Sequence, residues 1–289
     1  LASNENPLGF GDKARAAMAA ALDDLARYPD GNGFELKQAL CRRYGVAMDE
    51  IVLGNGSNDV LELAARAFLG PQTSAIYAQH AFAVYPLATQ AVGARGVEVP
   101  ARHFGHDLDA MLAAITPDTR VLFIANPNNP TGTYLPFDEI RRLHAGLPAN
   151  VLLVIDAAYA EYVRRNDYAA GVELVAATEN VVMTRTFSKV HGLGGARIGW
   201  AYLPAHVAAA LERGNVPMGD IAAIGGLAPL APSQVQVKTI ASGKSGNLGA
   251  NGVDTEWLSN TQFSLQARAD GLLPAMEASR KAGNSPRCQ

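Results

Sequence analysis

The segment from residue 120 to 189 contains three short apolar runs, and each run ends in polar or charged residues. The runs read RVLFIANPNNPTG at residues 120–132, VLLVIDAAY at 151–159 and VVMTRTFSK at 181–189. Short runs that are apolar throughout are typical of strands covered on both faces, as in a parallel sheet. Open α/β sheets bind ligands at the carboxyl ends of their strands. The sequence therefore predicts a binding site formed by the residues that follow these runs.

Strands and helices alternate on both sides of this segment. Strands are predicted at Ser74–Ala78, Arg120–Asn126, Val151–Asp156 and Val181–Phe187, and helices at Lys13–Leu25, Phe34–Tyr44, Asn58–Leu69, Asp107–Ile115 and Pro136–Leu147. Such alternation is typical of layered α/β domains. We therefore expect a three-layer α/β/α domain with a mainly parallel sheet.

Composition excludes several classes of protein. The chain has 289 residues and a formal net charge of -3, which gives no reason to expect a nucleic acid or an anionic membrane as partner. Its two cysteines, Cys41 and Cys288, predict no disulfide scaffold and suit a reducing cytoplasm. No apolar run approaches the roughly 20 residues of a membrane span. His103 and His106 are spaced H-x-x-H without a third ligand signature, so no metal site is expected.

Two of the predicted strands end in residues suited to covalent chemistry. Lys189 follows the strand at 181–187 beside Ser188. Desolvation favours the neutral form of its amine, which can form a Schiff base with an aldehyde. The alternative is that Lys189 is a solvated residue at the end of the strand. Asp156 ends the strand at 151–156 and could hold the nitrogen of a pyridine ring protonated, with the Tyr159 hydroxyl near a ring oxygen. The alternative for Asp156 is a helix N-cap.

Further candidates surround this pair. Asn129, in the turn NPNNPTG, could donate to a ring oxygen, and Phe82 could either stack on a ring or pack in the core. The sequence GNGSN at residues 54–58 precedes a helix, so its backbone N–H groups could bind an anion or simply form a tight turn. Arg197 lies eight residues after Lys189 and could bind the same anion through two hydrogen bonds.

The chain resembles the fold-type-I aminotransferases, which depend on pyridoxal 5'-phosphate. The resemblance rests on four features in this order: NPNNPTG, D-x-x-Y, T-F-S-K and Arg197. ASNENPLG at residues 2–9, RYPD at 27–30, LGNGSNDVLEL at 53–63 and HAFAVYPLATQ at 80–90 are similar to the histidinol-phosphate branch of that family. The resemblance covers about residues 1–203.

The resemblance implies a role for each matching residue. Lys189 would hold the cofactor as a Schiff base and move the α-proton, while Asp156 would pair with the pyridine nitrogen. Asn129 and Tyr159 would contact the phenolic oxygen of the ring, and Phe82 would stack on it. The residues implied to surround the phosphate are Gly56, Ser57, Asn58, Ser188, Arg197 and Tyr28 of the partner subunit.

The implied activity is amino transfer between histidinol phosphate or glutamate and a 2-oxo acid, in histidine biosynthesis, by a cytoplasmic homodimer. Two alternatives lie within the wider family, an aromatic amino acid aminotransferase and a threonine-phosphate decarboxylase. A third is a non-catalytic remnant that binds pyridoxal phosphate.

Three segments are expected. Residues 1–30 would form an N-terminal arm that contributes to the dimer and the active site, and residues 31–213 the cofactor-binding large domain. Residues 214–289 are rich in Gly, Ser, Asn and Gln and do not follow the family pattern. We expect a poorly folded or frameshifted tail there, in place of the family's small domain with its carboxylate-binding arginine, and hence an impaired enzyme.

Overall fold

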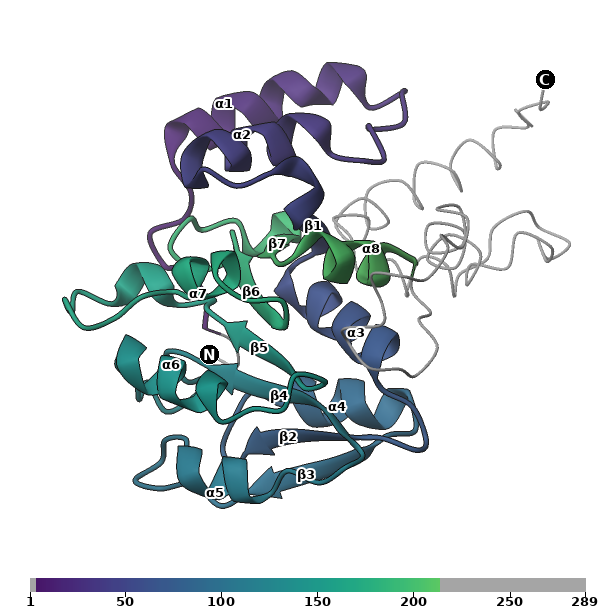
Figure 1. Cartoon of the computed structure of the whole chain (residues 1–289). Coiled ribbons are helices and arrows are strands. Elements are labelled where there is room, and N and C mark those ends of the chain that lie inside the picture. Colours follow the sequence, from purple (N-terminus) through teal and green to yellow (C-terminus); the bar gives the residue numbers. More distant parts are fainter. Residues whose placement is uncertain (1–3, 214–289) are drawn as a thin grey trace, which may run out of the picture.

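The computed structural model describes residues 4–213. In this part of the chain a seven-stranded sheet has the order β1-β7-β6-β5-β4-β2-β3 (Figure 1). Its strands are β1 (Ile51–Asn55), β2 (Ser74–Ala78), β3 (Arg95–Val99), β4 (Thr119–Ala125), β5 (Leu152–Asp156), β6 (Val181–Thr186) and β7 (Ile198–Tyr202). Five neighbouring strands are parallel, namely β6, β5, β4, β2 and β3. β7 runs antiparallel to both of its neighbours, β6 and β1. The prediction of a mainly parallel sheet is confirmed.

Helices cover both faces of the sheet and complete the three layers (Figure 1). They are α1 (Asp12–Ala21), α2 (Phe34–Tyr44), α3 (Ser57–Phe68), α4 (Val84–Ala91), α5 (Leu108–Ala113), α6 (Phe137–Ala145), α7 (Val172–Ala176) and α8 (Ala205–Arg213). α3, α4 and α8 pack on one face, and α2, α5, α6 and α7 pack on the other.

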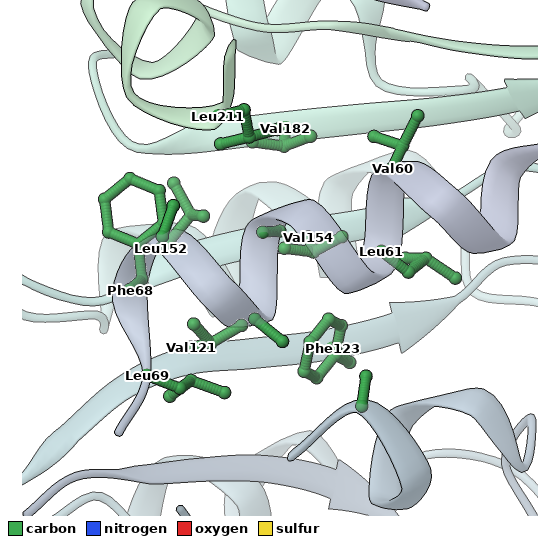
Figure 2. Packing of buried hydrophobic residues seen from close by; sticks show 14 of the residues in the cluster. Val60, Leu61, Phe68, Leu69, Val121, Phe123, Leu152, Val154, Val182 and Leu211 are labelled. Atoms are coloured by element: carbon green, nitrogen blue, oxygen red, sulfur yellow. The ribbon is translucent and has the colours of Figure 1, made fainter. Parts of the chain in front are cut away.

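Alternation along each strand produces two separate apolar cores. In β4, Val121 and Phe123 belong to the core beneath α3, whereas Leu122 and Ile124 belong to the core beneath α5 and α6. Figure 2 shows the first core, with Phe68 of α3 close to the strand residues. Both sets of side chains are buried, which is why the strand sequences are apolar throughout.

The predicted elements differ from the observed ones mainly at their ends. α6 begins at Phe137, and Pro136 is its N-cap with extended backbone rather than its first residue. α1 ends at Ala21 and is followed by a 3-10 turn at Leu22–Asp24. The sequence analysis does not predict the strands β1, β3 and β7 or the helices α4, α7 and α8. The expectation for residues 214–289 lies outside the described part of the chain.

Phe123 offers a test of this core. It is fully buried and its ring stacks on that of Tyr85, with centroids 4.9 Å apart. We expect Phe123→Ala to lower the free energy of unfolding by about 3–5 kcal/mol, because it leaves a cavity in a close-packed core. Chemical denaturation measures this loss. Leu87→Ala, at an exposed position of α4, is the control and should change it by about 0.5 kcal/mol or less. Equal losses in the two variants would contradict this description of the core.

Candidate functional site

A cavity of about 730 Å³ lies where the carboxyl ends of β4, β5 and β6 meet the N-terminus of α3. Most of the residues predicted from the sequence line it. These are Ser57, Asn58, Phe82, Asn129, Asp156, Tyr159, Ser188, Lys189 and Arg197. Segments far apart in the chain therefore converge at the edge of the sheet where the site was expected.

Asp156 lies buried at the inner end of the cavity. Its carboxylate accepts hydrogen bonds from the Tyr85 hydroxyl at 2.9 Å and from the Thr184 hydroxyl at 3.1 Å. It also accepts one from the backbone N–H of Ala158 at 3.3 Å. Burial raises the pKa of Asp156 above its ordinary value, whereas these hydrogen bonds and the charge of Lys189 act in the opposite direction. The site thus holds a carboxylate in a poorly solvated place with three donors directed at it.

Tyr85 and Thr184 are site residues that the sequence analysis missed. Burial raises the pKa of Tyr85 well above its ordinary value, so its hydroxyl stays protonated and remains a donor to Asp156. Thr184 is paired with Asp156 in the register of β5 and β6. β6 begins with three apolar residues, and a hydroxyl residue that follows them, opposite a carboxylate in the neighbouring strand, is a signal that could have identified Thr184.

Lys189, Tyr159 and Asn129 all contact the N-terminal arm. The Lys189 amine donates to the backbone carbonyl of Asn4 at 3.1 Å. The side-chain amide of Asn4 donates to the Tyr159 hydroxyl at 2.9 Å and to Asn129 Oδ1 at 3.3 Å. Asn6 donates to the carbonyl of Lys189 at 3.2 Å. Lys189 is half-buried, so its desolvation is less complete than the sequence predicts.

The start of α3 and Arg197 together form a cradle for an anion. Gly56 precedes α3 with φ 80, and no side chain caps the N-terminal N–H groups of the helix. The Arg197 guanidinium donates to the carbonyls of Asn55 at 3.2 Å and Gly194 at 3.1 Å. It also donates to the Ser188 hydroxyl at 3.4 Å. A Cβ added at Gly56 would lie 2.2 Å from Arg197 Nη2, so glycine is required for this approach. Free N–H groups beside a fixed guanidinium match a phosphate dianion.

Three predicted residues need separate description. Phe82 lines the cavity and meets the Tyr85 ring edge to face, with centroids 6.0 Å apart. Gly56 acts through its backbone and is not among the residues lining the cavity. Tyr28 is fully exposed and does not line the cavity of its own chain.

The histidine pair of the H-x-x-H spacing has no shared ligand geometry. His106 is buried with Nε2 2.9 Å from the carbonyl of Ala125, and desolvation lowers its pKa. His103 is exposed in a loop with positive φ. Between residues 4 and 213, no group of three or more His, Cys, Asp or Glu residues is placed to hold a metal ion. No helix in the same range is long and apolar enough to cross a membrane.

The order of these site residues along the chain, on a mainly parallel sheet, is typical of one class of proteins. Comparison with known protein families identifies that class. Residues 1–219 match the sequence model of the family described as Aminotransferase class I and II. The chain belongs to this family.

Individual proteins of similar sequence show which members of the family this chain resembles. Histidinol-phosphate aminotransferase 2 of Nitrosospira multiformis is 47% identical over 285 residues, which cover 96% of this chain and 73% of that protein. The protein of the same name from Ralstonia nicotianae is 56% identical over 217 residues, which cover 75% of this chain and 58% of that protein. The chain therefore spans roughly three fifths to three quarters of the length of these relatives.

A solved structure gives the same result. The histidinol-phosphate aminotransferase of Sinorhizobium meliloti, in complex with pyridoxal-5'-phosphate, has a TM-score of 0.70 and 30% sequence identity. The match covers 84% of this chain and 67% of that chain. The predicted resemblance to histidinol-phosphate aminotransferases is confirmed.

Proposed function

We propose that the chain is a pyridoxal-phosphate-dependent aminotransferase that moves an amino group between histidinol phosphate and 2-oxoglutarate, in histidine biosynthesis. One observation carries this proposal. A lysine amine, a buried carboxylate and an anion cradle border a single cavity, in the chain order of the family to which the protein belongs. The names of its relatives support the choice of substrates.

Each residue contributes a distinct step. The cradle of Arg197 and the α3 N-terminus would hold the phosphate, and Asp156 would accept a hydrogen bond from the protonated pyridine nitrogen. Asn129 and Tyr159 orient the ring through its phenolic oxygen. Bound in this way, pyridoxal phosphate supplies an aldehyde for an amine and a ring that withdraws electrons from the reacting carbon. Lys189 Nζ would take the α-proton from the substrate as a general base and deliver it, as a general acid, to the carbon of the former aldehyde.

The exposed N-terminal region supports a homodimer. α1 has no buried residue in the isolated chain, and Leu25, Tyr28 and Phe34 are 52%, 100% and 52% exposed. These exposed apolar side chains favour a protein partner, and a second copy of this chain is the simplest one. The family resemblance implies that Tyr28 of the partner subunit then reaches the phosphate cradle. Residues 1–30 then act as the dimer arm and residues 31–213 as the cofactor-binding domain. The low cysteine content supports a cytoplasmic location.

Arg197→Ala tests the phosphate cradle. Loss of one charge-assisted hydrogen bond of about 1.5–3 kcal/mol should weaken pyridoxal phosphate affinity at least roughly 10- to 100-fold. The reactivity of bound cofactor should change much less, because the phosphate contact is the same throughout the reaction. Absorbance titration of the full chain measures the affinity. Arg66→Ala, which removes an exposed arginine on α3, is the control. Unchanged affinity in the Arg197 variant would remove this residue from the phosphate site.

A half-reaction experiment tests the function as a whole. The full chain is loaded with pyridoxal phosphate and mixed with histidinol phosphate, and absorbance should report conversion to the amino form of the cofactor. Addition of 2-oxoglutarate should reverse the change. Phenylalanine and threonine phosphate run in parallel, and faster reaction with either would favour one of the two related enzymes. Cofactor binding without reaction toward any donor would instead indicate a non-catalytic remnant.

A further inference from the structure

A cluster of charged side chains lies behind the cavity, on the other face of β6. Thr184 faces Asp156, and the side chain of Arg185, the next residue, points to the opposite face, over the ring of Tyr44. The Arg185 guanidinium donates to the Glu161 carboxylate, and both side chains are largely buried, at 10% and 22% exposed. Glu161 also lies 3.7 Å from His191 Nε2. One carboxylate therefore contacts two basic side chains, of which Arg185 is largely buried and His191 is about half exposed.

Glu161 joins the two loops that carry the reactive groups of the site. It lies two residues after Tyr159 in the loop that follows β5, within the 3-10 turn Ala160–Tyr162. Its partner His191 lies two residues after Lys189 in the loop that follows β6, and the His191 ring packs on Phe187 at 5.2 Å. The contacts of Glu161 thus cross-link the Tyr159 loop to the Lys189 loop.

A third loop joins the same cluster through Tyr168. The Tyr168 hydroxyl donates to the carbonyl of Asn126, three residues before Asn129, at 2.8 Å. Burial raises the pKa of Tyr168 well above its ordinary value, Glu161 adds to the rise, and Arg185 opposes it. The hydroxyl therefore remains a donor. The loops after β4, β5 and β6 are all held from behind the cavity.

We propose that Glu161 is a positioning residue, which fixes the Lys189 amine relative to the Tyr159 ring by tying their loops together through Arg185 and His191. In the structure the amine lies 5.3 Å from the centroid of that ring. On the cavity side, the Lys189 amine donates to the carbonyl of the exposed Asn4, and the half-buried Asn6 donates to the Lys189 carbonyl, whereas the Arg185–Glu161 ion pair is largely buried. The inference rests on the proposed function, because it concerns the residue that would react with the cofactor.

Removing the Glu161 charge should misplace the amine without emptying the cavity. Glu161→Gln leaves the buried guanidinium without its carboxylate partner, so the loops must rearrange around it. The phosphate cradle is untouched. We therefore expect the rate of Schiff base formation with pyridoxal phosphate to fall roughly tenfold, as for other supporting contacts of reactive groups. Glu161→Asp keeps the charge and should recover most of the rate.

The experiment follows cofactor loading of the full chain by absorbance, and borohydride reduction with peptide mapping measures the share of pyridoxyl label on Lys189. Glu139→Gln, which removes a carboxylate from an exposed ion pair with Arg142, is the matched control and should load like the wild type. Thermal denaturation is recorded for each variant. Slower loading and less label on Lys189 in Glu161→Gln, with recovery in Glu161→Asp, supports the inference.

The outcomes separate this inference from the proposed function. A wild-type chain that does not load overturns both. Wild-type loading in Glu161→Gln overturns the positioning role alone, even where its melting temperature falls, since the ion pair would then be structural. Where Glu161→Gln does not fold, His191→Phe removes one contact of Glu161 and keeps a ring against Phe187. Its loading should slow roughly threefold, in line with a partly exposed ion pair, and an unchanged rate would overturn the inference.

Discussion

Lys189→Ala should abolish covalent attachment of the cofactor and lower turnover by roughly four orders of magnitude. The substitution removes the amine that attacks the aldehyde and the general base that moves the α-proton, and the second role alone accounts for about 10²–10⁴-fold. The phosphate cradle and Asp156 remain, so cofactor should still bind without a covalent bond. Borohydride reduction and mass spectrometry should then detect no stable pyridoxyl label.

A second lysine variant controls for the loss of an amine as such. Lys37 on α2 does not line the cavity and pairs with Glu212 at 3.1 Å, and Lys37→Ala should label and turn over like the wild type. In the wild type, peptide mapping should place the label on Lys189. Label on Lys238 or Lys244 would contradict the assignment, and so would appreciable turnover by the Lys189 variant.

The strands of the inner sheet could be predicted because burial on both faces favours apolar residues at successive positions, as in the first residues of β5 and β6. β2 has the predicted bounds, β5 and β6 differ from the predicted strands by one residue at one end, and β4 is shifted by one residue at both ends. β3 reads RGVEV and lies at the edge of the sheet, with Arg95, Gly96 and Glu98 exposed, so its sequence lacks that pattern. The antiparallel direction of β7 follows from its pairing with β6 and β1, which no local pattern encodes.

The site was predictable where chemistry and position coincide in one short segment. Asp156, Lys189 and Asn129 each follow an apolar run, so their convergence follows from the parallel sheet. Asn4 could not be placed in the same way, because its contacts with Tyr159 and Lys189 bridge more than 150 residues and depend on how the arm packs.

The sequence analysis did not identify the supporting residues Tyr85 and Glu161, for a related reason. Tyr85 and Glu161 lie within runs that resemble ordinary helix and turn sequence, and their roles depend on partners on other elements. It is easier to identify a reactive residue from a sequence pattern than to identify the residues that hold it in place.

Asp156→Asn should leave cofactor affinity within about threefold of the wild type and lower turnover roughly 100-fold. In the proposed function the carboxylate would stabilise a protonated pyridine nitrogen through a charged hydrogen bond of about 1.5–3 kcal/mol, and about 1.4 kcal/mol corresponds to a tenfold change. The amide has the same shape and can still accept from Thr184 and Ala158. The phosphate cradle is unchanged, so the loss should fall on kcat and on the spectrum of the bound cofactor.

Tyr85→Phe separates the charge of Asp156 from its surroundings. This variant keeps the carboxylate and removes the hydroxyl that donates to it at 2.9 Å. That hydrogen bond lowers the pKa of Asp156 against the effect of burial, so its loss should raise this pKa further. Because the reaction needs the ionised carboxylate, the acid limb of the kcat profile should move to higher pH, with near-normal turnover on the alkaline side. Asp156→Asn should be slow at every pH. Near-normal turnover in Asp156→Asn would show that Asp156 only caps the backbone of its loop through the N–H of Ala158.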